Sequence, residues 1–152
     1  MRLKTLVVFF ALLMAGSGSL AASPWHTEGT YPTPWGEVGY RIAGDGPPLL
    51  LLHGYFGQGR QWEPFLETFT EHYMVIAPDL LCHGTSTITG ENFEVAASAE
   101  ALWQLLDALA LSEIRAVGYS AGGMTLLQMA AQRPTAIEAM ILASSAHVLE
   151  AA

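Results

Sequence analysis

Cysteine and lysine are almost missing from this 152-residue chain. Cys82 is the only cysteine, which excludes an intrachain disulfide and leaves no cysteine near the N-terminus for lipid attachment. Lys4 is the only lysine, and fourteen acidic residues stand against six basic ones. Because an acidic surface repels phosphate backbones, this balance argues against nucleic acid as a partner.

Charged residues are also scarce, at 13% of the chain, whereas hydrophobic residues make up 51%. This composition argues against disorder and is typical of a globular domain with a large core, and the length fits one domain. The sequence contains no internal repeat, metal-ligand cluster, dinucleotide fingerprint or phosphate loop. We therefore expect no cofactor and no metal.

The first 21 residues have the pattern of a secretory signal peptide. Arg2 and Lys4 precede the apolar run 6–14, and small residues lead to Ala21, after which we expect cleavage. A membrane anchor is the alternative, but the run is shorter than the roughly 20 residues that a span needs. Cleavage leaves four basic and fourteen acidic residues, a net charge of −10. We expect an exported protein, periplasmic or secreted, without a membrane segment after cleavage.

Short apolar runs alternate with amphipathic segments along the rest of the chain. Residues 22–34 are predicted as an extended lead-in, and residues 35–152 as the folded domain. We expect strands over 35–43, 49–52, 74–77, 114–119 and 137–143. We expect helices around 62–69, 95–109 (with Asn92 as N-cap) and 121–132. This order predicts the α/β class: a mostly parallel sheet with helices on both faces.

The segment Gly118-Tyr119-Ser120-Ala121-Gly122 is the strongest indication of chemistry. Ser120 lies between an expected strand and an expected helix, which is the setting of a nucleophile elbow. The sharp turn exposes the hydroxyl, which still needs an adjacent base to act as a nucleophile. Side chains at Gly118 and Gly122 would clash in such a turn. The alternative is an ordinary glycine-rich turn, and the strand–helix context favours the elbow.

Two further loops are predicted at the same edge of the sheet. His53-Gly54-Tyr55-Phe56-Gly57 follows a buried strand, so its amides point into the crevice that holds Ser120. The amides of Tyr55 and Ala121 make a pair suited to an oxyanion, although an ordinary strand–helix turn remains open. In the loop 78–86 we interpret Asp79 and His83 as structural, because Asp side chains brace loops by accepting from backbone amides.

Together, these three segments resemble the α/β-hydrolase superfamily, in its single-domain esterase, C–C hydrolase and haloperoxidase-like branch. The resemblance implies Ser120 as the nucleophile, the Tyr55 and Ala121 amides as the oxyanion hole, and a small-molecule ester or related acyl substrate. Acyl transfer, peroxide-dependent chemistry and C–C cleavage use the same machinery, whereas the dehalogenase and epoxide-hydrolase branches use Asp in place of Ser. Cys82 is a departure, because the family usually has Gly before the histidine of that loop.

The resemblance also implies a later acid and a later histidine, which have no counterpart here. His147 and Glu150 follow the last expected strand, but so short a tail cannot easily bring both to Ser120. Three histidines precede the elbow and match no base position: His26, His53 and His72. We expect an N-terminal portion of a longer hydrolase, with residues 137–143 as an apolar edge open to pairing. The alternative is a catalytically inactive α/β-hydrolase-like binding module.

Overall fold

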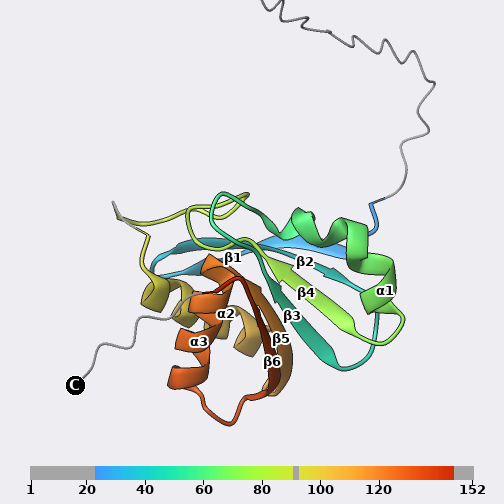
Figure 1. Cartoon of the computed structure of the whole chain (residues 1–152). Helices are drawn as coiled ribbons and strands as arrows, with labels where there is room; N and C mark the ends of the chain where they lie inside the picture. Colours follow the sequence, from blue (N-terminus) through green and yellow to red (C-terminus); the bar gives the residue numbers. More distant parts are fainter. Residues whose placement is uncertain (1–22, 91–92, 146–152) are drawn as a thin grey trace, which may run out of the picture.

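The computed structural model describes residues 23–90 and 93–145 (Figure 1). The predicted signal peptide, the expected N-cap Asn92, and His147 and Glu150 lie outside the described residues. Of the helices within those ranges, none has the length and apolar character that a membrane span requires.

A six-stranded sheet forms the centre of the fold, in the order β1-β2-β4-β3-β5-β6. Its strands are β1 (Thr27–Thr33), β2 (Gly36–Ala43), β3 (Pro48–Leu52), β4 (Met74–Pro78), β5 (Ile114–Tyr119) and β6 (Ile137–Ala143). The pairs from β4 to β6 are parallel, whereas β1 and β2 join the sheet in antiparallel orientation. The predicted α/β class with a mostly parallel sheet is confirmed.

Strand β1 lies inside the segment that the sequence predicted only as an extended lead-in. It pairs with β2 along its whole length, from Thr27 opposite Ile42 to Thr33 opposite Gly36. No residue of β1 is fully buried, so it carries none of the apolar alternation that marks a strand in sequence. Its backbone partner, rather than its side chains, makes it a strand.

Helices cover both faces of the sheet. They are the 3₁₀ helix η1 (Gly59–Phe65), α1 (Leu66–Thr70), α2 (Val95–Ala108) and α3 (Ala121–Gln132). The prediction of a single helix around 62–69 is wrong. This segment forms η1, which contains Pro64, followed by the short helix α1. Because a 3₁₀ helix has about 3.0 residues per turn, Phe65 leaves the predicted apolar face and is 57% exposed.

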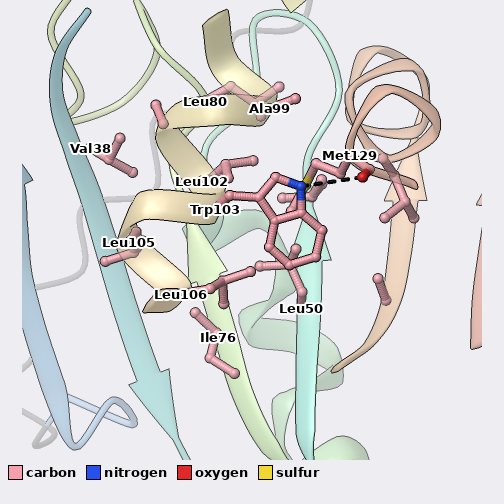
Figure 2. Close-up of a cluster of buried hydrophobic side chains, with 14 of the residues drawn as sticks. Val38, Leu50, Ile76, Leu80, Ala99, Leu102, Trp103, Leu105, Leu106 and Met129 are labelled. Atoms are coloured by element: carbon pink, nitrogen blue, oxygen red, sulfur yellow. Dashed lines mark hydrogen bonds between the residues drawn. The ribbon is translucent and has the colours of Figure 1, made fainter. Parts of the chain in front are cut away.

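Successive residues of the central strands enter two different cores. Leu50, Leu52 and Ile76 pack beneath α2 and α3 around Trp103, as Figure 2 shows in part. On the opposite face, Leu49, Leu51 and Val75 are among the residues that pack with Leu66 of α1. Burial of each such side chain contributes about 1.5–3 kcal/mol. The indole N–H of Trp103 donates to Met129 O at 3.2 Å, which joins α2 to α3 (Figure 2).

A buried carboxylate near the carboxyl end of β4 joins β2, the start of η1 and the loop after β4. The Asp79 side chain is fully buried and accepts from Arg41 Nη1 at 2.9 Å, from Gly59 N at 2.6 Å and from Thr85 N at 2.8 Å. Arg41, on β2, is itself only 3% exposed. Ser86 adds a bond from its hydroxyl to Asp79 O at 2.7 Å. Asp79 therefore attaches the loop after β4 to β2 and to the start of η1.

Candidate active site

Ser120 occupies a strained turn between β5 and α3. Its φ is 51° and its ψ is −117°, a conformation that costs a residue with a side chain about 1–3 kcal/mol. The backbone around it holds this turn: Ser120 N donates to Ala143 O at 2.8 Å, and Ser120 O accepts from Gly123 N at 2.9 Å. The hydroxyl of Ser145 also donates to Ser120 O, at 3.1 Å. Contacts from β6 and α3 thus maintain the strained serine.

The predicted need for glycine on both sides of Ser120 has a direct geometric basis. A Cβ at Gly118 would lie 2.6 Å from Gly123 Cα. A Cβ at Gly122 would lie 2.5 Å from the carbonyl oxygens of both Leu52 and His53. These neighbours are backbone atoms, which cannot swing aside as a side chain can. Glycine therefore allows the start of α3 to pack directly on the end of β3.

The loop after β3 lies against the turn that holds Ser120. A Cβ at Gly54 would be 3.2 Å from Ser120 Cβ and 2.8 Å from the Tyr119 ring. Gly57 N donates to Gly54 O at 3.0 Å and closes a tight turn, in which Phe56 has a φ of 60°. Two segments that lie far apart in sequence are thus in contact at this edge of the sheet.

Backbone donors are available beside the serine. The amides of Tyr55 and Ala121 donate to no backbone or side-chain acceptor within residues 23–90 and 93–145. Ala121 is the first residue of α3, where amides lack an intrahelical acceptor and the helix dipole favours negative charge. These two donors can therefore bind an anionic oxygen without breaking an existing hydrogen bond.

Aromatic side chains form a wall next to these donors. The rings of Tyr55 and His83 are 5.2 Å apart between centroids, and those of Tyr55 and Phe93 are 6.0 Å apart. An open pocket of about 280 Å³ lies among Tyr55, Phe56, Gly57, Cys82, His83, Gly84 and Phe93. None of these lining residues is Asp, Glu, Lys or Arg. The pocket suits an uncharged apolar group.

His83 is part of this aromatic wall, and the buried His53 lies next to it. His53 is fully buried; its Nε2 accepts from Leu80 N at 2.9 Å, and its Nδ1 lies 2.7 Å from Gly54 O. Burial lowers the pKa of His53, and the nearby His83 lowers that pKa further. His83 Nδ1 lies 2.9 Å from Leu81 O. Since both nitrogens of His53 have backbone partners, His53 is not free to act as a base toward Ser120.

The described part of the chain supplies no base for the serine. Over residues 23–90 and 93–145, no side chain is hydrogen-bonded to the Ser120 hydroxyl. In the same ranges, no three His, Cys, Asp or Glu side chains gather as a metal site would require. The site as described therefore consists of a strained serine, two free amides and an aromatic pocket.

Comparison with known proteins shows what the chain as a whole is similar to. Residues 47–152 match the family model for the alpha/beta hydrolase fold. The uncharacterized protein Rv2715 of Mycobacterium tuberculosis is 38% identical over 109 residues, which are 72% of this chain and 32% of that protein. This chain thus spans about a third of that curated relative's length.

Two solved structures extend the comparison. A hydrolase from Pseudomonas aeruginosa PA01 is 27% identical with a TM-score of 0.77, over 82% of this chain and 48% of its own. The N-acyl homoserine lactonase AidH, complexed with N-butanoyl homoserine, is 27% identical with a TM-score of 0.72, over 78% of this chain and 45% of its own. This chain spans about half of each.

Proposed function

The chain belongs to the alpha/beta hydrolase fold family, and on that premise we propose that Ser120 is the nucleophile of a serine hydrolase. Its substrates are carboxylic esters or related small acyl compounds. The observation that carries this proposal is the positive φ of Ser120, held between β5 and α3 directly beside the loop of Gly54 and Tyr55. Strained backbone is concentrated at functional sites, and here the strained residue carries a hydroxyl and is followed directly by the free Ala121 amide.

The proposed reaction is acyl transfer to Ser120. The serine oxygen bonds to the acyl carbon, the carbonyl electrons move to the carbonyl oxygen, and the Tyr55 and Ala121 amides stabilise the resulting oxyanion. The N-terminus of α3 adds a favourable dipole. Loss of one such donor typically lowers turnover by about 10²–10³-fold. The general base takes the serine proton and gives it to the alcohol as the intermediate collapses, and water then releases the acid by the same route.

The proposal requires a general base and an acid that are not among the described residues. Loss of the base lowers turnover by roughly a millionfold. Oxyanion and substrate binding alone still accelerate the reaction about 10³–10⁴-fold over the rate in water. The substrates and turnover of the functional protein therefore depend on residues beyond those that line the site here. Acyl transfer to an acceptor other than water uses the same serine and the same amides.

An ester substrate is favoured by the chemistry of the pocket and by one relative. The pocket beside Tyr55 and Phe56 has no carboxylate, ammonium or guanidinium in its lining, which suits an uncharged acyl or alkyl group. One similar structure is described as a lactonase, and a lactone is a cyclic ester. Both observations favour a neutral, partly apolar ester.

A catalytically inactive binding module is the second candidate. The observation that favours it is the absence of a hydrogen-bonded base at Ser120 within residues 23–90 and 93–145. In this case the aromatic pocket binds a small neutral ligand, and the apolar β6 edge pairs with another chain.

A phosphonate probe for active serines separates the two candidates. In a protein that also carries the general base, we expect one covalent adduct on Ser120, found by intact mass and peptide mapping, and none in Ser120→Ala. Ser112→Ala is the matched control, because Ser112 is exposed at the turn before β5 and leaves the site intact. Equal labelling of wild type and Ser120→Ala in that protein, or no labelling of either, supports the binding module.

Export is a separate proposal. Residues 1–21 combine a basic start, an apolar run and small residues before Ala21, as a cleavable signal does. Expression of the full chain with N-terminal sequencing of the exported protein tests it. We expect a mature N-terminus at Ala22, and an uncleaved chain retained in the membrane fraction supports an anchor.

A further inference from the structure

We propose that His53 is a positioning residue that sets the direction of the Tyr55 amide by holding the Gly54 carbonyl. This inference rests on the proposed function, because the Tyr55 amide matters as an oxyanion donor. His53 matched no base position in the sequence, and neither of its ring nitrogens is free in the structure. Its two hydrogen bonds nevertheless define its role.

The hydrogen bonds fix both the charge and the tautomer of His53. Leu80 N–H can only donate, so Nε2, 2.9 Å away, must accept and carries no proton. The proton of the neutral ring therefore sits on Nδ1, which donates to Gly54 O at 2.7 Å. A protonated ring would place two N–H groups against each other at Leu80. Full burial opposes that charged form as well.

The bond to Gly54 O controls the next amide because a peptide group is planar. In a trans peptide, the carbonyl of one residue and the N–H of the next point in opposite directions. With Gly54 O directed at the His53 ring, the Tyr55 N–H is directed away from that ring. Gly57 N also donates to Gly54 O, at 3.0 Å, so two donors hold this carbonyl. The same peptide packs against Ser120 through Gly54.

A second attachment fixes the other end of the same loop. Gly59 N donates to Asp79 Oδ1 at 2.6 Å, while His53 reaches Leu80 N. Both ends of the loop 54–59 are thus bound to two consecutive residues after β4. Loss of the His53 donor leaves the Gly54 carbonyl held by Gly57 N alone, which loosens the Gly54–Tyr55 peptide while the Asp79 attachment persists. The two attachments can be tested separately for this reason.

Two variants of His53 each keep one of its hydrogen bonds. In Asn the side-chain nitrogen is as many bonds from Cα as Nδ1 of His, so His53→Asn retains a donor for Gly54 O. In Gln the side-chain oxygen is as many bonds from Cα as Nε2, so His53→Gln retains an acceptor for Leu80 N–H. Each variant loses one bond to the backbone, which makes them matched controls for stability.

The test uses the full chain labelled with ¹⁵N. We expect long-range ¹H–¹⁵N spectra to show His53 as the Nδ1–H tautomer. We expect the Tyr55 amide signal to move in His53→Gln and to stay in place in His53→Asn, at similar urea midpoints. The rate of phosphonate labelling at Ser120 should fall about 10²-fold in His53→Gln and less than about tenfold in His53→Asn, because only the first loses the aligned donor.

Each outcome decides the proposal. An Nε2–H tautomer, an unmoved Tyr55 signal in His53→Gln, or equal shifts in both variants overturns it. If wild-type Ser120 takes no phosphonate even where the general base is present, the proposed function fails, and the tautomer and the Tyr55 signal still decide whether His53 positions this amide. If labelling is normal in both variants while the Tyr55 signal moves only in His53→Gln, His53 sets the amide but the amide does not bind the oxyanion.

Discussion

Replacement of Asp79 by Asn should destabilise the fold far more than the same replacement at Asp107. The two carboxylates are chemically alike, since each accepts from both terminal nitrogens of one arginine. They differ in burial. The Asp79 side chain is 0% exposed and its partner Arg41 is 4% exposed, whereas Asp107 and Arg133 are 51% and 37% exposed.

The magnitude follows from the bonds that an asparagine cannot replace. Oδ1 of Asp79 accepts from Arg41 and Gly59, and Oδ2 accepts from Arg41 and Thr85. Whichever way the new side-chain amide of Asp79→Asn turns, its NH₂ faces a backbone N–H and the guanidinium. Removal of one charge from a buried pair costs about 3–5 kcal/mol. The exposed pair at Asp107 contributes about 0–1 kcal/mol.

Thermal and urea unfolding measure this difference. For a chain of this size each kcal/mol corresponds to about 2–4 °C in Tm, so Asp79→Asn should lower Tm by about 6–20 °C. Asp107→Asn should lower Tm by less than about 4 °C. Equal losses in the two variants, or a stable Asp79→Asn, would refute the view that Asp79 anchors the loops around the site.

Backbone packing, pH and the open sheet edge each give a further prediction. Gly122→Ala should lower the free energy of unfolding by about 1–3 kcal/mol, because its Cβ meets two fixed carbonyls. Urea unfolding measures this loss. Gly29→Ala is the control, because its Cβ meets only the Tyr40 side chain, at 3.4 Å. Stability should fall in two stages as the pH is lowered. Burial, His83 and Arg41 lower the pKa of His53, although the hydrogen bond to Gly54 and the charge of Asp79 raise it, so the unfolded chain binds more protons below about pH 6.5. Burial alone would raise the pKa of Asp79, but hydrogen bonds from Arg41, Thr85 and Gly59 lower it, so a second loss of stability follows below about pH 4. His53→Gln should remove only the first stage of this profile. Ile141→Lys should reduce self-association in sedimentation velocity, because Ile141 is 64% exposed on the apolar edge strand β6 and charge blunts such edges; unchanged association would show that the edge does not pair.

The central strands could be predicted from sequence because their side chains carry the signal. Residues 114–119 and 137–143 form strands at the predicted bounds, and helix 121–132 does as well. Each apolar run ends at a glycine, a proline or a polar turn, so its limits are visible locally. The motif around Ser120 could be predicted for the same reason, because the need for glycine at 118 and 122 arises within one turn.

The remaining features depend on partners that are distant in sequence. Strand β1 owes its conformation mainly to β2, since none of its own residues is fully buried. The role inferred for His53 depends on Leu80, 27 residues away, and the pairing of Arg41 with Asp79 joins residues 38 apart. No local pattern announces such bonds. For the role of His53, the one local signal was its position directly before the glycine of the loop that follows a buried strand.

A crystal structure of the phosphonate adduct tests the central claim most directly. We expect phosphorus bonded to Ser120 Oγ, with one phosphonyl oxygen about 2.7–3.1 Å from both the Tyr55 and the Ala121 amide nitrogens. The aromatic pocket beside Tyr55 should hold the apolar group of the probe. An adduct on another residue, or a phosphonyl oxygen turned away from both amides, would contradict the assignment of Ser120 and these two donors.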